Sequence, residues 1–394
     1  MKSNIETNFD SFAKRIKLSD QEKKERTDSL RESYMPFKVT EHYTKLIESE
    51  SGLSRSQLLN IILPPTNSKP FEGRFDPYAN AKVRKENTHY IQHKYLKTLL
   101  FHIDDFCFAN CQFCYKVGEI RVEEKTKEPY KKKLEKVVNY LNQHPEVDNI
   151  LLTGGDPGAK PTKQLVDILE QISKPDNIKT IRFATKGLSF DPARFQDPEL
   201  LLYFKRLNEQ DGKRINIIAQ YNHPSEIDQE SQKSLRMLQE SGVQVYGQPV
   251  IIKGVNDNVD TLTELQNKFL ENNIQPYYLI QFMPVKGVEQ YGIPLEETFR
   301  IVAESKRKLN GLAKKGVLIA PHDWGKLEIV GLSPSLEDPK RILLKWHQIV
   351  TPNYLPQELK DFKAEDLFEL DFKPKSLFCF DHLLEHNGLP HLKQ

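Results

Sequence analysis

Two hydrophobic patterns alternate along most of this chain. Short apolar runs rich in β-branched and aromatic residues recur from about residue 95 to residue 283, and charged segments with helical spacing of apolar positions separate them. Strands that alternate with helices predict a parallel sheet with right-handed crossovers. The predicted strands are Leu96–Ile103, Asn149–Thr153, Lys179–Thr185, Ile215–Tyr221, Val243–Ile252 and Tyr277–Met283. The predicted helices are Lys131–Gln143, Thr162–Ser173, Pro198–Asn208, Asp228–Glu240 and Val259–Glu271.

This order of elements predicts an α/β fold, namely a partial (β/α)6 barrel with a helical N-terminal extension and a short C-terminal extension. By analogy with complete barrels, ligands gather at the carboxyl ends of the strands. We expect the helical extension to cover residues 1–90, the barrel residues 91–314 and the C-terminal extension residues 315–394. In the first segment, Ser11–Ile16 and His42–Ile47 have helical spacing. In the last, Val317–Pro321 and Leu327–Val330 are predicted as short strands, followed by an irregular tail.

Composition excludes several classes of protein. Of the 394 residues 38% are hydrophobic, which is enough for a sizeable core. The 57 basic and 55 acidic residues give a net charge of +2, which offers no electrostatic case for a nucleic-acid partner. No apolar run approaches the roughly 18 residues that a membrane-spanning helix needs, and the polar start MKSNIETNFD does not resemble a signal peptide. We therefore expect a soluble cytoplasmic protein that engages no membrane.

Three of the four cysteines form a cluster, Cys107, Cys111 and Cys114, in a loop after the first predicted strand. Thiolates at this spacing select iron–sulfur clusters, zinc or copper(I), and a reducing compartment favours metal ligation over disulfides. An electron carrier normally supplies four cysteines for each cluster, and structural zinc usually takes four protein ligands. Cys379 is either a distant fourth ligand or a small buried hydrophobe. Three ligands leave one iron open to an outside molecule, which favours a catalytic cluster over a zinc site.

A glycine pair ends the second predicted strand, in the stretch Gly154-Gly155-Asp156-Pro157. Glycines at a strand end let the backbone approach a ligand closely, although this stretch by itself is an ordinary turn. In order after the cysteine loop, the two motifs resemble the radical S-adenosylmethionine (SAM) superfamily. This resemblance implies a 4Fe–4S cluster on the three cysteines, whose open iron chelates the amino and carboxylate groups of SAM. Reductive cleavage would then give a 5′-deoxyadenosyl radical that abstracts hydrogen from the substrate.

The wider chain resembles the lysine 2,3-aminomutase branch of that superfamily, from about Asp76 to Val330. The resemblance implies that Gly154, Gly155, Asp156, His223 and Gln248 hold SAM. It also implies that Lys326 carries pyridoxal phosphate as a Schiff base, which requires a lysine with a lowered pKa. The matching segments are His93–Tyr95, Ile181–Thr185, Asn222–Ile227, Gly247–Gln248, Gly254–Asp257, Pro276–Tyr278 and Ala320–Lys326.

Several positions depart from the branch pattern. Lys116 stands where an arginine binds the substrate carboxylate, and lysine lacks the bidentate fork of arginine. Met283 and Ile319 replace two aspartates that hold the distal ammonium of lysine, so free lysine is an unfavourable substrate. Three bulky residues, His322–Trp324, replace a glycine-rich turn and could crowd a cofactor ring or stack on it.

The zinc site of the lysine enzyme is also not expected here. Asn258 occupies the first cysteine position of that site, and the tail offers only Cys379. The predicted partners are an amino-acid-like small molecule and an electron donor such as flavodoxin or ferredoxin, with a homo-oligomer left open. Two alternatives stand beside the aminomutase-like enzyme. One is a radical SAM enzyme without pyridoxal phosphate that dehydrogenates, epimerises or modifies a protein side chain. The other is a non-catalytic iron–sulfur protein.

Overall fold

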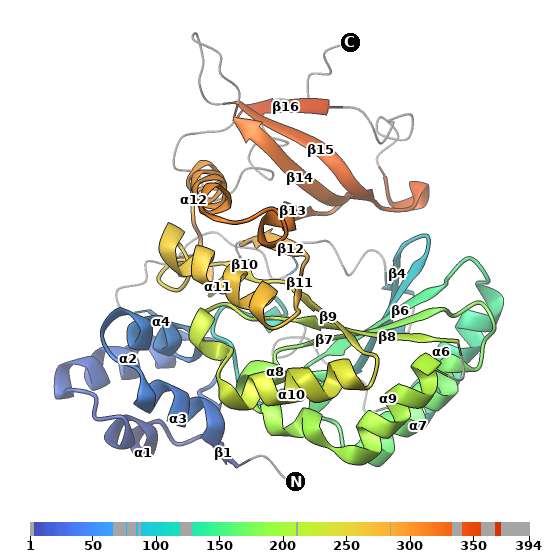
Figure 1. The fold of residues 1–394 in the computed structure, drawn as a ribbon, viewed down its shortest axis with the longest axis horizontal. Coiled ribbons are helices and arrows are strands. Elements are labelled where there is room, and N and C mark those ends of the chain that lie inside the picture. Colours follow the sequence, from blue (N-terminus) through green and yellow to red (C-terminus); the bar gives the residue numbers. More distant parts are fainter. Residues whose placement is uncertain are drawn as a thin grey trace.

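A mostly parallel sheet of eight strands forms the lower half of the molecule in Figure 1, and helices cover its outer face. The computed structural model describes residues 4–65, 76, 84–85, 88–118, 128–209, 212–283, 285–332, 341–355 and 367–371. Strands β5, β6, β7, β8, β9 and β11 of this sheet run parallel in that order. The predicted α/β class with a parallel sheet is therefore confirmed. The strands and connecting helices are β5 (Thr98–Asp104), α6 (Tyr130–Gln143), β6 (Asn149–Gly154), α7 (Thr162–Ser173), β7 (Thr180–Thr185), α9 (Pro198–Glu209), β8 (Arg214–Ala219), α10 (Gln229–Glu240), β9 (Gln244–Gly247), α11 (Val259–Glu271) and β11 (Gln275–Pro276).

Burial alternates along these strands, as the two-residue period of a strand requires. In β5, Leu99 and Phe101 are buried in the main apolar core, together with Leu134 and Val137 of α6. The next residues in the alternation, Leu100 and His102, face a cavity on the opposite side of the sheet. One face of the sheet therefore anchors the helices, and the other lines the space where ligands can enter.

The fifth and sixth parallel strands each leave one sheet and enter a second one. The predicted strand Val243–Ile252 is two strands, β9 and β10 (Val250–Ile251), and the sixth is β11 followed by β12 (Tyr278–Gln281). Strands β10, β12 and β13 (Val317–His322) run parallel, and α12 (Leu295–Lys308) connects the last two.

Two parts of the sequence-based prediction were wrong. The tail predicted as irregular contributes β15 (Arg341–Ile349) and β16 (Leu367–Asp371), which extend the second sheet antiparallel beyond β14 (Gly325–Leu332). The N-terminal segment predicted as helical contains β3 (Arg84–Lys85) and β4 (Thr88–Tyr95), and β4 pairs antiparallel with β5. The hairpin turn at Leu96-Lys97 carries no glycine, so it gave no turn signal.

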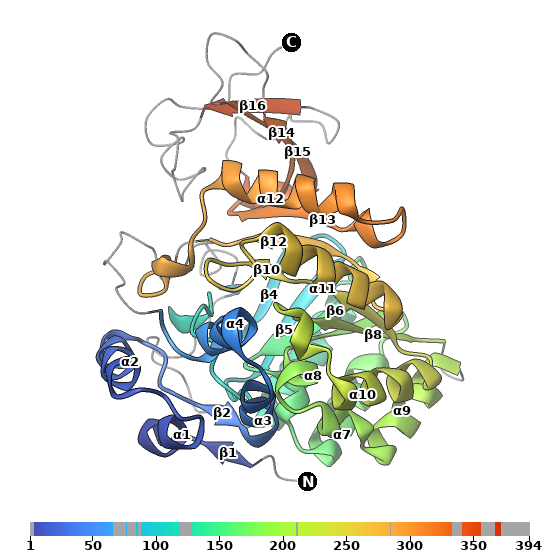
Figure 2. The same ribbon diagram turned by 60° about the vertical axis from the view of Figure 1, so that its left-hand side comes forward.

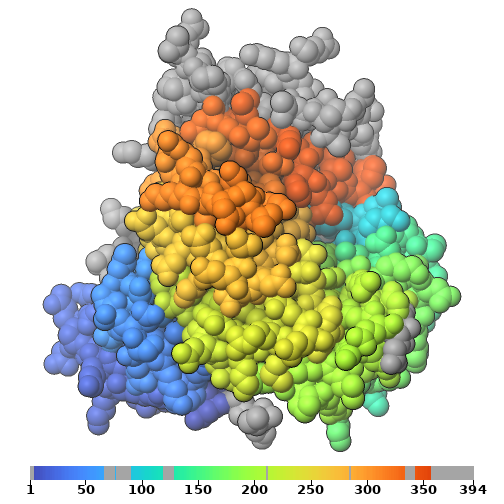
Figure 3. Space-filling view, viewed as in Figure 1, coloured from blue at the N-terminus to red at the C-terminus, as the bar shows by residue number. Residues whose placement is uncertain are grey.

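Four helices form the N-terminal segment, which lies against the sheet on the left of Figure 1 and comes forward in Figure 2. Figure 3 shows this segment in direct contact with the part of the chain around residues 220–270. Side chains cap three of the helices: Asn8, Ser19 (a capping box with Glu22) and Thr40 each accept a backbone N–H. The elements are β1 (Ile5–Glu6), α1 (Phe9–Arg15), α2 (Asp20–Glu32), β2 (Val39–Thr40), α3 (Glu41–Ser49) and α4 (Gly52–Ile62). No helix in the described ranges is long and apolar enough to cross a membrane.

Candidate active site

A cavity of about 670 Å³ lies between the two sheets and the loops that follow β5, β6 and β7. This volume is within the range of small-molecule and cofactor sites, roughly 300–1,000 Å³. Most of the residues singled out in the sequence line it: Cys107, Cys111, Cys114, Lys116, Gly154, Gly155, Asp156, Gln248, Met283 and Lys326. His223 and Ile319 are not among its lining residues.

Burial dominates the chemistry of the cysteine thiols. It raises the pKa of Cys107 to about 12, and that of Cys111 well above its usual value. As thiolates, buried sulfurs need a compensating positive charge, which a metal cluster supplies. Three thiols on one cavity wall therefore fit an iron–sulfur cluster. Cys379, the other ligand considered, lies outside the described residues.

The N-terminal segment holds the cysteine loop in place, which sequence reasoning did not anticipate. The Lys38 ammonium donates to the Cys107 carbonyl at 2.5 Å and lies 3.6 Å from the centroid of the Phe106 ring. The Asn110 amide donates to Pro36 O at 2.8 Å, and its backbone N–H donates to Lys38 O at 3.0 Å. These bonds hold the loop between Cys107 and Cys111 in place, and the residues that make them belong to the N-terminal segment.

Gln112 adds a second set of contacts between the same two segments. Its backbone N–H donates to Ile61 O at 2.9 Å, its amide donates to Met35 O at 3.1 Å, and its carbonyl accepts from the Ser33 hydroxyl at 2.8 Å. The side chain is 1% exposed, so every one of these bonds is shielded from water. We define the N-terminal clamp as residues 33–38 and Ile61 acting on this loop.

The glycine pair at the end of β6 packs directly on the start of the cysteine loop. A Cβ at Gly154 would lie 2.1 Å from Asp104 O, and one at Gly155 would lie 2.2 Å from Phe106 O. Gly154 also has a φ of +120°, which residues with a side chain rarely adopt. The Gly155 N–H donates to Asp104 O, and the Asp156 N–H donates to Phe106 O at 2.8 Å. The pair therefore sets the distance between β6 and the loop.

The Asp156 carboxylate ties β6 to β7. It accepts from the Thr185 hydroxyl at 2.7 Å, from the Lys186 N–H at 2.8 Å and from the Gly158 N–H at 2.9 Å. Burial raises its pKa, and these hydrogen bonds oppose the rise. Because both carboxylate oxygens accept hydrogen bonds from protein groups, Asp156 holds the ends of β6 and β7 together at this wall of the cavity.

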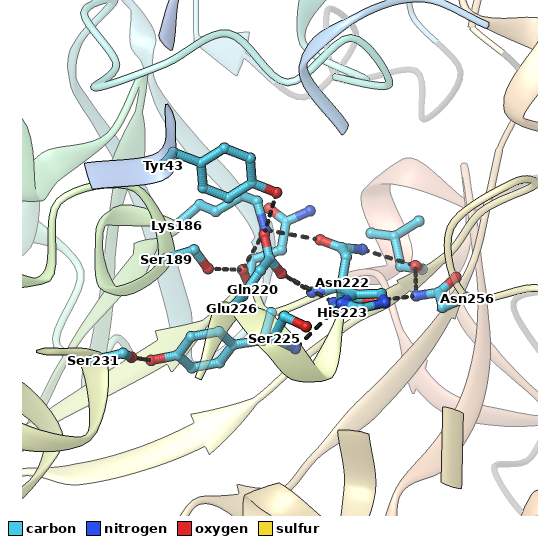
Figure 4. Close-up of polar contacts among 12 residues, drawn as sticks. Tyr43, Lys186, Ser189, Gln220, Asn222, His223, Ser225, Glu226, Ser231 and Asn256 are labelled. Atoms are coloured by element: carbon cyan, nitrogen blue, oxygen red, sulfur yellow. Dashed lines mark hydrogen bonds and ion pairs between the residues drawn. The ribbon is translucent and has the colours of Figure 1, made fainter. Parts of the chain in front are cut away.

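A buried ion pair beside Cys111 was also missed. Lys186, just after β7, meets Glu226 at 2.5 Å, with 5% and 0% of their side chains exposed. Glu226 also accepts the Tyr43 hydroxyl at 3.2 Å and the backbone N–H groups of Asn222 and His223 at 2.5 and 3.1 Å. Figure 4 shows these groups converging from α3, β7 and the loop after β8.

His223 belongs to this network and not to the cavity wall. Its Nδ1 accepts the Ser225 N–H at 3.2 Å, so its Nε2 carries the proton and donates to Gln57 Oε1 at 2.9 Å. Burial lowers its pKa to about 4, which keeps the ring neutral. Both ring nitrogens are bound to protein groups here, and the contact with SAM that the resemblance implies stays a prediction.

Lys326 lies on β14, in a different electrostatic environment. Burial, Arg182 and Lys94 lower its pKa to about 7. Its ammonium donates to Gln348 Oε1 at 2.5 Å and lies 4.3 Å from the centroid of the Tyr95 ring. A lysine with a lowered pKa and a fixed position is suited to forming a covalent adduct with a carbonyl compound.

The bulky turn before Lys326 does not crowd the cavity. Trp324 is not a lining residue. It packs against buried apolar residues of the second sheet, with its ring centroid 6.4 Å from that of Trp346. His322 does line the cavity, and its carbonyl accepts the Lys94 ammonium at 3.0 Å. Gly325 has a φ of +142°, and a Cβ there would lie 2.0 Å from Gln348 O.

The expected substrate residues lie in different places. The Lys116 ammonium donates to the Thr153 hydroxyl and, at 3.1 Å, to Gly154 O, so it is held at the end of β6. Met283 lines the cavity. Ile319 is fully buried on β13 in an apolar cluster with Tyr278 and Ile280.

Comparison with known proteins agrees with this arrangement. Residues 103–265, which include the cysteine loop and the glycine pair, match the Radical SAM superfamily. The chain therefore contains a radical SAM domain. Its curated relatives are named as lysine or glutamate 2,3-aminomutases, which agrees with the branch that the sequence motifs predict. A radical SAM domain implies a 4Fe–4S cluster and SAM, and the three cysteine thiols of the cavity wall fit that donor set.

The relatives are distant but cover much of the chain. The "Putative L-lysine 2,3-aminomutase" of Aquifex aeolicus is 29% identical over 80% of this chain and 82% of its own length. The "L-lysine 2,3-aminomutase" of Methanococcus maripaludis is 28% identical over 67% of this chain and 60% of its own. The "Glutamate 2,3-aminomutase" of Clostridioides difficile is 24% identical over 83% of this chain and 75% of its own length. Among solved structures, a radical SAM methyltransferase from Sphaerobacter thermophilus gives a TM-score of 0.39 at 14% identity, over 58% of this chain and 68% of its own.

Proposed function

We propose that this protein is a 2,3-aminomutase-like isomerase that uses SAM and pyridoxal phosphate and acts on an amino acid other than free lysine. The observation that carries the proposal is that the three cysteine thiols, Lys116 and Lys326 line one cavity. When bound, the cluster with SAM supplies a radical that abstracts hydrogen, and pyridoxal phosphate supplies a π system across which an amino group can migrate.

The residues around Lys326 fit pyridoxal phosphate. Lys94 and Arg182 lie close enough to lower the pKa of Lys326, and both line the cavity. We assign the phosphate group to these two cations and the covalent attachment to Lys326. Tyr95 and Tyr278, whose ring centroids lie 4.3 and 5.6 Å from the Lys326 ammonium, present flat surfaces for a heteroaromatic ring.

The charge of the cavity wall favours a substrate without a distal ammonium. Among the described lining residues the one carboxylate is Asp156, and its oxygens are engaged by Thr185 and two backbone N–H groups. A second ammonium would be buried beside Met283 without a partner, at a cost of several kcal/mol. Lys116 is placed to meet the substrate carboxylate as a point charge.

We further propose that the parallel strands from β5 to β12 form the partial (β/α)6 barrel, flanked by extensions at residues 1–90 and 315–394. An external one-electron donor such as flavodoxin or ferredoxin would reduce the cluster. Closure of the cavity around the substrate would protect a radical from water.

The test is an anaerobic screen of free amino acids with the reconstituted protein, scored by release of 5′-deoxyadenosine and by formation of the β-amino acid. We expect neutral or anionic amino acids to exceed lysine. Lys326→Ala should lose the bound pyridoxal phosphate, read from its absorbance band, and still release 5′-deoxyadenosine from SAM under strong reduction. Lys308→Ala, a surface lysine paired with Asp260, is the matched control. Retention of pyridoxal phosphate by Lys326→Ala would overturn the assignment, and lysine as the best substrate would overturn the predicted specificity.

A further inference from the structure

Four potential metal ligands meet at the opposite end of β5 from the cysteine loop. His93 lies on β4, Tyr140 lies on α6, and His144 and Glu146 lie in the connection from α6 to β6. One ligand atom from each of His93, His144 and Glu146 lies within 4.8 Å of the others. The Tyr140 hydroxyl is 3.0 Å from His93 Nδ1. None of these residues lines the active-site cavity.

The hydrogen bonds in this group fix the orientation of the His93 ring. A backbone carbonyl can only accept, so Nε2, at 3.1 Å from Leu96 O, carries the proton. Nδ1 therefore presents its lone pair toward Tyr140. A ring whose second nitrogen donates to a carbonyl is the usual arrangement of a metal-bound histidine. His93 is 8% exposed, so the packing around it also holds its ring in place.

His144 and Glu146 complete the group on its more exposed side. His144 Nδ1 lies 2.8 Å from Glu146 Oε1, and its ring stacks on that of Tyr140 with centroids 4.0 Å apart. A hydrogen bond from His144 lowers the pKa of Glu146, followed by its own backbone N–H. The Glu146 carboxylate therefore places an oxygen ligand next to two imidazoles.

We propose that His93, His144 and Glu146 bind a zinc ion, with Tyr140 or water as the fourth ligand. Two imidazoles and a carboxylate are a common zinc ligand set. Ligand bonds of roughly 2.0–2.1 Å in a tetrahedral site put neighbouring ligand atoms about 3.3 Å apart, so the group closes with small side-chain movements.

The position of this site suggests what it does. A bound ion would join β4 to the end of α6 across the hairpin that β4 forms with β5. The two residues after His93 on β4 are Lys94 and Tyr95, and both line the cavity close to Lys326. Zinc would thus stiffen the strand that carries them. The proposal concerns residues outside the cavity and does not depend on the proposed reaction.

The test is zinc binding by the full-length, cluster-loaded protein under anaerobic conditions. Zinc is titrated against a competing chelator, with zinc and iron per chain measured by mass spectrometry and the melting temperature recorded in parallel. We expect one zinc per chain beyond the cluster, with a rise in melting temperature. His144→Ala and Glu146→Gln, at partly exposed positions that tolerate change, should each weaken binding at least ~10-fold.

Two controls separate this site from other zinc ligands. The triple variant Cys107→Ala, Cys111→Ala, Cys114→Ala removes the thiols and should still bind one zinc. His42→Ala removes an imidazole that lies 3.5 Å from the Asp228 carboxylate and should leave the affinity for zinc unchanged. The proposal is overturned if the loaded wild-type protein binds no zinc, or if His144→Ala and Glu146→Gln bind it as tightly as the wild type.

Discussion

The cysteine loop and the surroundings of Lys326 line the same cavity but are built on different physical principles. The cysteine loop is positioned by hydrogen bonds to its backbone, from the N-terminal clamp on one side and from the end of β6 on the other. Lys326 lies on a regular strand, and its chemistry is set by neighbouring side chains: two cations, two aromatic rings and one amide. Geometry therefore governs one region and electrostatics the other.

This difference predicts how each region responds to change. A backbone-held loop should fail when a hydrogen bond or a close approach is lost. A strand-borne lysine should keep its place when neighbours are mutated but change its pKa. A substitution that disrupts one of the two regions should therefore leave the structure of the other unchanged.

The largest expected effect separates the two regions directly. Cys111→Ala removes one of three cluster ligands, so iron content and 5′-deoxyadenosine release should fall to background. Pyridoxal phosphate should still bind at Lys326, because no hydrogen bond among the described residues joins Lys326 to the loop. Iron analysis and the cofactor absorbance band measure both in one sample. Loss of both cofactors together would show that the two regions are not independent.

Glu226→Gln should destabilise the cysteine-loop side of the molecule strongly. It leaves the Lys186 ammonium buried without its charged partner, a change that typically costs roughly 3–5 kcal/mol. The shift of the urea midpoint measures the cost. In the double variant Lys186→Met, Glu226→Leu, with no buried charge left, part of the stability should return. A cost below about 1 kcal/mol for Glu226→Gln would show that the pair is exposed in solution.

Lys38→Met tests the N-terminal clamp by removing its charged hydrogen bond to the Cys107 carbonyl. Such a bond contributes roughly 1.5–3 kcal/mol, so loss of iron to a chelator should accelerate at least ~10-fold. Lys38→Arg should restore most of the retention. Lys45→Met, at an exposed position near Glu41, serves as the control. Unchanged iron retention in Lys38→Met would mean that the clamp does not hold the loop.

The smallest effect is the pH dependence at Lys326. Its pKa of about 7 lies below the usual value near 10.4, so the reactive neutral amine is already dominant above neutral pH. The rate of pyridoxal phosphate capture by cofactor-free protein should rise roughly tenfold from pH 6 to pH 8 and then level off. Stopped-flow absorbance follows the reaction. A rate that climbs steadily to pH 10 would indicate an ordinary lysine.

The comparison also explains what the sequence could reveal. The cysteine spacing, the glycine pair and Gln248 were found because each motif is local, and all of them line the cavity. Lys186, Lys38 and Lys94 could not be distinguished among 57 basic residues, because their importance comes from partners distant in the chain. Gln348 was missed for a further reason: its strand, β15, follows a proline-containing stretch that predicted an irregular tail.

His223 shows the same limit of sequence reasoning. Its motif, Asn222–Ile227, matched the family pattern, but the motif could not show that Gln57 of α4 occupies the second ring nitrogen. Helical periodicity predicted the N-terminal helices and gave no sign of the surface they would cover.

The glycine pair at Gly154 and Gly155 has a consequence for how this protein can diversify. Any side chain at either position would displace the first turn of the cysteine loop, since backbone atoms lie 2.1 and 2.2 Å from where it would begin. These two positions therefore admit no side chain, and changes of specificity must arise elsewhere on the cavity wall. An engineer who wishes to move this chemistry to another scaffold must carry the β6 terminus along with the three cysteines.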